Sequence, residues 1–183
     1  MNETNDAEWN NAKEKEVWNE AKEKELNDRV DENLKAYEGC NFLEQYAIYM
    51  IRVQMYELSL KQDLIEIFKV SEEKVETMNL ASILRYYEKH DIRAHILLYF
   101  GITNIAAQRN FMAHEFLARL GWASMDIGEE AVQIFHKEFS RCARNIETAL
   151  QRYLMLKETD LLYKDYGVEA KYPYPVAGFI NVV

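Results

Sequence analysis

The sequence predicts an all-α fold, and three observations predict it. Only two prolines occur among the 183 residues, and both lie near the C-terminus, so no proline interrupts a helix before Pro173. Apolar residues recur at spacings of three and four along most of the chain. Residue types that begin or end helices, such as Asn and Gly, separate these runs. We therefore expect an up-and-down bundle of four to five main helices.

Length and charge restrict the class of protein. A chain of 183 residues, 49% apolar and 29% charged, is long enough for one domain with a single core. The net charge of −9 argues against a surface that coats nucleic acid, because such binding neutralises many phosphates. It still allows a ribonuclease with a local basic cleft. Cys40 and Cys142 lack the spacing of metal ligands or of a redox pair.

The sequence also bears on location. The N-terminus is acidic and polar, unlike a secretory signal, and the most apolar stretch, 96–107, is too short to span a bilayer. We expect a cytoplasmic protein that has two reduced thiols and does not enter a membrane.

Residues 1–38 form the first expected unit, a charged helix over 7–38. The segment Ala12–Glu16 recurs as Ala21–Glu25, and strong helix formers fill it. A loose apolar stripe runs along it: Trp9, Trp18, Ala21, Leu26, Val30, Leu34 and Tyr37. A helix with so narrow a stripe needs a surface to rest on, either the body of this chain or a partner protein. Gly39 ends it.

Residues 39–167 form the expected helical body. Asn41 and Glu44 have the spacing of a capping box, and the helix from 42 to about 68 buries an apolar stripe. Ser71 and Asn79 begin two shorter helices, and Asp91 precedes a longer one over 92–120, with a bend expected at Gly101. Gly121 is expected to close that helix.

The last helix is expected from Glu129, with Asp126 before it, to about Tyr166. Its apolar stripe comprises Val132, Phe135, Phe139, Cys142, Ile146, Ala149, Leu150, Tyr153, Leu154 and Leu161. On its other sides lie His136, Arg141, Arg144 and Arg152, which form a solvated face or, where the helix borders the site, hold RNA backbone through Arg141 and Arg144. Residues 168–183 form an extended tail whose apolar end covers a groove on this chain or on a second copy.

The segment 109–116, R-N-F-M-A-H-E-F, concentrates the chemistry. The guanidinium of Arg109 binds phosphate through a fork of N–H donors and keeps its charge at every relevant pH. The imidazole of His114 can move a proton near neutral pH. Such a pair could cleave RNA without a metal, with the 2′-hydroxyl as the internal nucleophile and Arg109 holding the charge on phosphorus.

Helix geometry constrains this pair. Asn110 and His114, four residues apart, share a face of an ideal helix, whereas Arg109 points about 140° away from His114. The two groups converge through the reach of the Arg side chain, through a helix end, or by meeting a second copy across a two-fold axis. The third option favours a homodimer.

R-N-x-x-x-H in a late helix of a small all-helical chain resembles the R-x4-6-H signature of HEPN domains, and the resemblance covers about 41–166. It implies a metal-independent endoribonuclease of a toxin–antitoxin or phage-defence system, with its cleft between two protomers. It would make Arg109 and His114 catalytic and Asn110 supporting. Toxins paired with a nucleotidyltransferase antitoxin carry a modified tyrosine two places after the His. Phe116 stands there and has no hydroxyl to modify.

The sequence lacks the motifs of other common catalytic sites, and it leaves two other functions open. We find no H-E-x-x-H zinc motif, no Glu-x-x-His pair, no glycine-rich phosphate loop and no serine nucleophile elbow, and we expect neither a metal nor a cofactor. The alternative is a catalytically silent HEPN-like bundle that binds a protein partner or a nucleotide, in which His114 is buried against Phe116 or Arg109 pairs with a Glu. A third hypothesis is that the protein is an assembly adaptor that acts through the N-terminal helix.

Overall fold

The computed structural model describes residues 18–90, 105–126 and 129–158. In chain order its elements are α2 (Glu20–Leu34), the short 3-10 turn η1 (Lys35–Tyr37), α3 (Phe42–Glu66), α4 (Glu72–Glu76), α5 (Leu80–Lys89), α7 (Ile105–Phe111), the π-helical turn η2 (Met112–Phe116), α8 (Leu117–Asp126) and α9 (Glu129–Glu158). No strand occurs within these three ranges, which confirms the all-α prediction. Among these helices, none has both the length and the apolar character that a membrane crossing requires.

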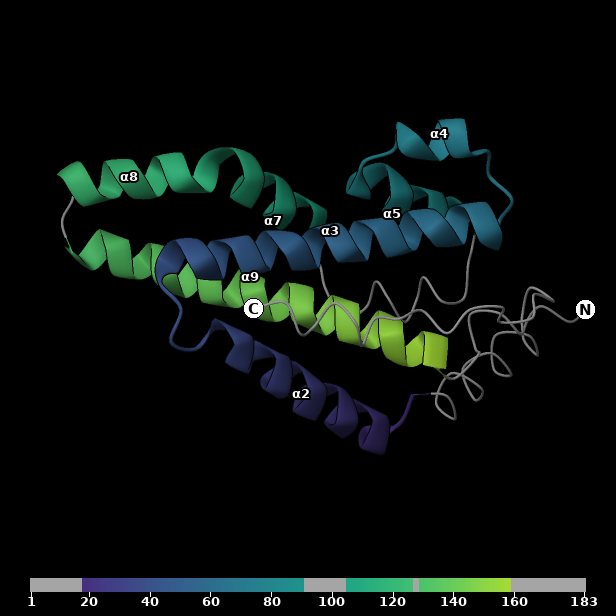
Figure 1. Cartoon of the computed structure of the whole chain (residues 1–183), viewed down its shortest axis with the longest axis horizontal. Helices are drawn as coiled ribbons and strands as arrows, with labels where there is room; N and C mark the ends of the chain where they lie inside the picture. The colour runs from purple at the N-terminus through teal and green to yellow at the C-terminus, as the bar shows by residue number, and fades with distance from the viewer. Residues whose placement is uncertain (1–17, 91–104, 127–128, 159–183) are drawn as a thin grey trace, which may run out of the picture.

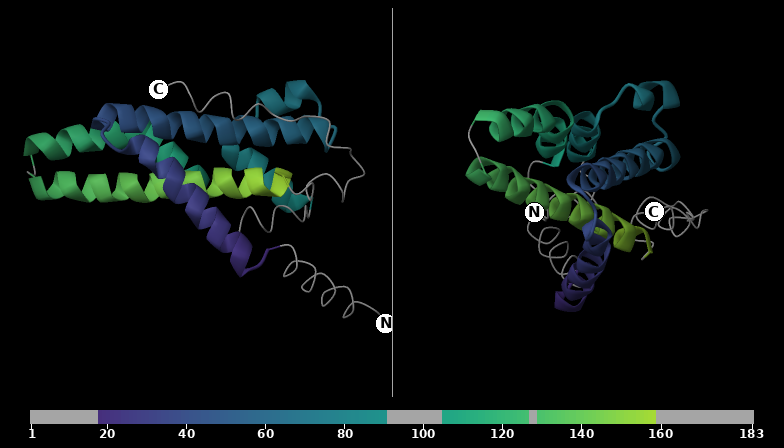
Figure 2. Two further views of the ribbon diagram at one scale, coloured as in Figure 1. Left: turned by 60° about the horizontal axis from the view of Figure 1, so that its bottom comes forward. Right: turned by 60° about the vertical axis from the view of Figure 1, so that its left-hand side comes forward.

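The two longest helices, α3 and α9, run side by side through the middle of the molecule (Figure 1). α7 and α8 lie along one side of this pair together with α5, and α2 crosses α9 obliquely on the opposite side (Figure 2). The main core fills the space between them. Its largest side chains include Tyr49, Tyr56, Leu60, Leu64, Ile83, Tyr87, Phe116, Phe139, Ile146 and Tyr153.

Local hydrogen bonds explain where the helices begin. The Asn41 side-chain oxygen accepts bonds of 3.0 and 3.1 Å from the backbone N–H groups of Leu43 and Glu44, and the Glu44 carboxylate accepts one of 2.7 Å from the Asn41 N–H. This capping box confirms the predicted start of α3. Asn79 caps α5 through one bond, which its side-chain oxygen accepts from the backbone N–H of Ser82, whereas Ser71 occupies the N-cap position of α4 without a side-chain bond.

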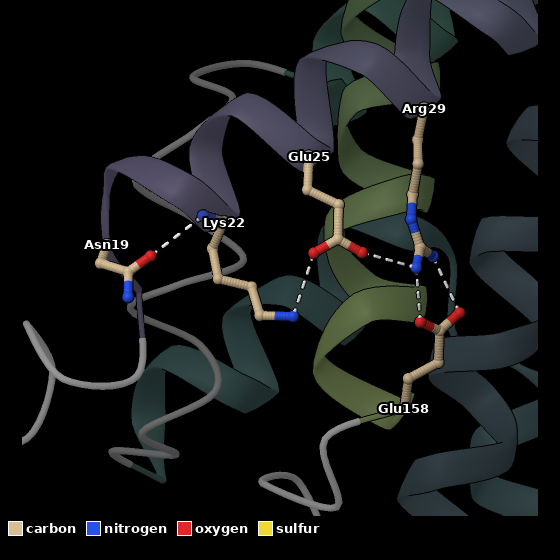
Figure 3. Close-up of polar contacts among 5 residues, drawn as sticks. All are labelled: Asn19, Lys22, Glu25, Arg29 and Glu158. Carbon is tan, nitrogen blue, oxygen red and sulfur yellow. Dashed lines mark hydrogen bonds and ion pairs between the residues drawn. The ribbon is translucent and has the colours of Figure 1, made fainter.

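α2 packs on α9. Leu26 and Val30 are fully buried with Met155 in a small second cluster. At its edge the guanidinium of Arg29 donates two bonds of 2.8 Å to the carboxylate of Glu158 (Figure 3). Thus the described part of the N-terminal helix rests on the body of this chain. Residues 7–17 of the expected helix lie outside the described residues.

Two buried acids join α3 to α9, and our reading of the sequence singled out neither. Asp63 of α3 accepts a 2.7 Å bond from the Tyr153 hydroxyl and lies 3.0 Å from Lys157 Nζ. Glu147 of α9 lies 2.9 Å from Arg52 Nε on α3. Removal from water raises the pKa of both carboxyl groups above the usual range, although the neighbouring cations oppose the shift.

The boundary expected at Gly121 is wrong. The helix continues through this residue to Asp126, so Asp126 is the last residue of α8 and not the N-cap of the next helix. A glycine inside a helix costs only about 1 kcal/mol relative to alanine, which packing of α8 on α9 offsets. The expected features at Asp91, Gly101, Leu161, Tyr166 and Gly167 and in the tail 168–183 lie outside the described residues.

Candidate functional site around Arg109 and His114

A π-helical turn occupies the middle of the candidate motif. Arg109 and Asn110 lie at the end of α7, and His114 is the central residue of η2. A π turn is closed by i→i+5 hydrogen bonds and is therefore wider than an α-helical turn. η2 begins three residues after Arg109, so the helix between Arg109 and His114 departs from the ideal α geometry on which the expected separation of about 140° rests. Such turns occur frequently at functional sites.

Contacts with α3 hold the π turn in place. The Tyr46 hydroxyl donates a 2.7 Å bond to the backbone carbonyl of Met112. Phe116 is fully buried and stacks on Phe42 at 5.9 Å between ring centroids. Phe111 and Phe135 meet the Phe116 ring edge-on, each at 5.7 Å. The apolar side of the turn thus points inward, and His114 is exposed on the other side.

Arg109 is partly buried and is held from two directions. Its guanidinium donates a 3.0 Å bond to the Asn110 side-chain oxygen and lies 3.5 Å from a carboxylate oxygen of Glu57 on α3. The other carboxylate oxygen of Glu57 lies 3.5 Å from Lys61 Nζ, one turn further along α3. Sequence reasoning missed Glu57 and Lys61, since an acid four residues before a lysine is common on any helix surface.

Arg109 and Asn110 are therefore in contact at the end of α7, and His114 lies in the π turn that follows, with its side chain exposed. The enzyme hypothesis expects His114 in an open, basic cleft near a second copy of the chain, and of these features the structure shows the exposure of the side chain. The ion pair of Arg109 with Glu57 is the contact that the silent bundle predicts. Each hypothesis thus finds one of its expected features in the structure.

The structure does not bring Arg141 and Arg144 to this segment by any contact. Arg141 is exposed and pairs with Glu138 on its own helix. Arg144 lies 2.6 Å from Asp31 of α2, although its neighbour Asn145 donates a 3.1 Å bond to Gln108 of α7. α9 therefore borders α7, but Arg144 is directed toward α2.

The remaining polar residues of α9 divide between the surface and the interior. His136 is exposed, with its ring edge-on to Phe42 at 5.1 Å. Arg152 is buried, with its guanidinium 5.2 Å from the Trp18 ring and 3.4 Å from Glu23. His136, Arg141 and Arg144 therefore lie on a solvated face of α9. The prediction that Arg152 shares this face is wrong. The packing of Arg152 against α2 removes it from water.

An apolar row extends from His114 along α8, which we call the α8 face. At spacings of four, three and four, His114 is followed by Ala118, Gly121 and Met125. Met125 is 84% exposed, and Trp122 beside it is 73% exposed. A second exposed row, the α3 face, consists of Leu43, Ala47, Ile51, Gln54 and Leu58. Both rows are without charge except for the His114 imidazole.

The arrangement can bind a phosphate through Arg109 and can move a proton through His114. Among the described residues, no group of three or more His, Cys, Asp or Glu side chains is placed to hold a metal ion. Comparison with models of protein families, with curated proteins and with solved structures finds no match to this chain.

Proposed function

We propose that the chain is a metal-independent endoribonuclease of the HEPN type, acting in the cytoplasm as a toxin or antiphage-defence effector. The observation that supports this proposal is the π turn with the exposed His114 at its centre, directly after the Arg109 guanidinium and the Asn110 amide, which are in contact at the end of α7. A π turn held by a tyrosine hydroxyl costs regular hydrogen bonding, and such local departures cluster at functional sites.

The reaction uses three groups of this segment. The 2′-oxygen of a ribose attacks the adjacent phosphorus, and the bond from phosphorus to the 5′-oxygen of the next nucleotide breaks. His114 takes the proton of the 2′-hydroxyl, and the imidazolium so formed gives a proton to the departing 5′-oxygen. Arg109 binds the charge that builds up on the phosphate oxygens. Asn110 orients the guanidinium through the 3.0 Å bond. The products are a 2′,3′-cyclic phosphate and a 5′-hydroxyl.

A second copy of the chain would complete the site. The α8 face begins at His114 and is apolar and rich in small side chains, which allow helices to approach closely. Packing of this face against its own copy would set two sites near one two-fold axis. An RNA strand would then be bound between two protomers, and an antitoxin or another protein partner could act by covering the same cleft.

The alternative is a catalytically silent bundle that binds a protein partner or a nucleotide through this surface. The ion pair of Arg109 with Glu57 favours it, because an arginine already neutralised by a carboxylate can serve a structural role. Under this alternative, His114 is a surface histidine without a chemical task.

Cleavage of labelled RNA in EDTA by the purified protein tests the proposal. We expect the wild-type protein to leave 2′,3′-cyclic phosphate ends, and we expect Arg109→Ala and His114→Ala to lower the rate at least about 100-fold, the usual size of a lost acid–base group. Arg85→Ala on α5 is the matched control, since Arg85 is exposed and its guanidinium donates a bond to the backbone carbonyl of Ala81 on its own helix. It should cleave as the wild type does.

Circular dichroism and thermal melting would show that the variants are folded. No cleavage across several RNAs, or cleavage that persists in both Arg109→Ala and His114→Ala, would reject the ribonuclease and leave the silent bundle.

A further inference from the structure

Glu57 is shared by two cations that come from different helices. Arg109 approaches it from α7 and Lys61 from its own helix α3, each at 3.5 Å from a different carboxylate oxygen. The three side chains are 15–26% exposed, so they lie partly shielded beside the π turn and remain open to a ligand from solvent.

Both contacts of Glu57 are long. Charge-assisted hydrogen bonds between nitrogen and carboxylate oxygen usually measure about 2.7–2.9 Å. Two ion pairs that involve α2 fall within that range: Lys24 lies 2.7 Å from Asp28, and Arg29 lies 2.8 Å from Glu158. Glu57 therefore attracts Arg109 and Lys61 by charge without close hydrogen bonds. A guanidinium has five N–H donors, so the bond to Asn110 leaves donors for a further anion.

A carboxylate between two cations occupies the place that suits a phosphate. A phosphodiester carries one negative charge on two free oxygens, as a carboxylate does, and can accept from both cations at once. The Glu57 carboxylate and an incoming phosphate would repel each other. Only one of them can therefore hold the two cations.

We propose that Arg109 and Lys61 form a two-cation clamp for a single RNA phosphate, and that Glu57 occupies this clamp until the phosphate displaces it. The ligand's identity rests on the proposed ribonuclease function, whereas the clamp rests on the contacts of Glu57. Lys61 thereby becomes a phosphate-binding residue, and Glu57 becomes an internal competitor that weakens the binding of RNA. The ion pair of Arg109 with Glu57 is then the resting state of the site, not a purely structural contact.

Binding of an RNA that cannot be cleaved, a 2′-O-methyl oligonucleotide, tests the clamp in the full-length protein. We expect Glu57→Gln to bind it about three- to tenfold more tightly than the wild type, the size of one removed repulsion at a partly exposed site. The matched control is Glu32→Gln on α2, which removes the same charge from an exposed pair with Lys35. It should change the affinity little.

The salt dependence of binding tests Lys61 separately. Each phosphate contact to single-stranded nucleic acid contributes about 0.7 to the slope of log affinity against log salt concentration. Lys61→Gln should lower this slope by about that amount and weaken binding severalfold, whereas Lys35→Gln on α2 should leave the slope unchanged.

The outcomes separate the clamp from the catalytic proposal. Equal or weaker binding by Glu57→Gln, an unchanged salt slope in Lys61→Gln, or no binding of the oligonucleotide by any variant would overturn the clamp, even if the wild type cleaves RNA. Tighter binding by Glu57→Gln together with a reduced slope in Lys61→Gln would support it, even if the wild type cleaves no RNA. Melting temperatures near that of the wild type would show that both variants are folded.

Discussion

The hydroxyl of Tyr46 supplies a hydrogen bond to a backbone carbonyl inside the π turn, at Met112. Burial raises the pKa of this phenol above its usual value, so the hydroxyl keeps its proton and remains a donor across the physiological range. His114 lies two residues further along the same turn. The position of the imidazole therefore depends on a side chain that comes from another helix and takes no part in the chemistry.

Replacement of Tyr46 by Phe tests this dependence. The change removes one donor and leaves the Met112 carbonyl without it, so we expect the free energy of unfolding to fall by about 1 kcal/mol. We also expect the NMR chemical shifts of the His114 imidazole to change and cleavage to slow. Urea denaturation and a two-dimensional spectrum of the histidine rings would measure both effects.

Tyr86→Phe provides the control, because the Tyr86 ring is partly buried and rests against the His90 ring at 4.2 Å between ring centroids. Imidazole shifts of His114 that stay unchanged in Tyr46→Phe would contradict a positioning role, even if stability falls.

The sequence predicts which residues are candidates for the site, but it does not predict the contacts that they make. Arg109, Asn110 and His114 could be selected because their chemical types and spacing are visible in the chain itself. The π turn could not, since it depends on a bond from Tyr46, 66 positions away from Met112. The pairing of Arg109 with Glu57 requires the packing of α7 against α3, which no local pattern reveals.

At the scale of the elements, α3 and α9 each contribute one buried acid that pairs with a cation of the other helix. α3 provides the acid Asp63 to Tyr153 and Lys157, and it provides the base Arg52 to Glu147. A shift of one helix along the other would leave two carboxylates buried without partners, which is far more costly than the loss of a surface pair. These contacts fix how far α3 is advanced relative to α9.

The buried acids make stability depend on pH. The pKa of Asp63 and that of Glu147 are raised in the folded state, so in the interval between the unfolded and folded pKa values the folded chain binds more protons than the unfolded chain. Their contribution is fully present below the unfolded values, near 3.8 and 4.5, and is lost as the pH rises through the folded values. We expect the free energy of unfolding to decrease over that interval.

Urea denaturation at a series of pH values would measure this decrease. Comparison with Asp63→Asn and Glu147→Gln isolates the two groups, because the repulsion within a chain of net charge −9 is nearly the same in all three proteins. Each variant should show a shallower decrease than the wild type. Identical slopes would contradict the assignment.

The boundaries of the elements show which features are local. The starts of α3 and α5 follow from Asn41 and Asn79, whose side chains bond to the next turn and need nothing else. The prediction that the helix ends at Gly121 is wrong, because a glycine ends a helix only where the following chain turns away. Packing of α8 on α9 keeps the helix going.

The whole molecule combines a strongly acidic composition with two uncharged faces, the α8 face and the α3 face. The described helices leave both rows open to solvent. Contiguous apolar patches on a protein surface often mark sites of contact with other proteins. The α8 face begins at His114, and for that reason we propose it as the contact with a second copy of the chain.

Light scattering coupled to gel filtration tests this assignment. We expect the wild type to have twice the chain mass of 21.7 kDa, and we expect Trp122→Glu to be a monomer, because a charge in an apolar contact loses its hydration. Leu43→Glu on the α3 face is the matched control and should remain a dimer. A monomeric Leu43→Glu together with a dimeric Trp122→Glu would move the interface to α3.

A π turn inside a helix amounts to one inserted residue that the flanking turns absorb without changing their direction. In an ordinary α-helix, two residues four apart share a face. η2 begins three residues after Arg109, and His114, five positions from Arg109, is its central residue. Deletion of Ala113 would bring the same two side chains to a spacing of four in a regular helix, with α7 and α8 still facing the same way. In a helix that contains a π turn, the number of residues between two side chains is therefore a poor guide to the angle between them.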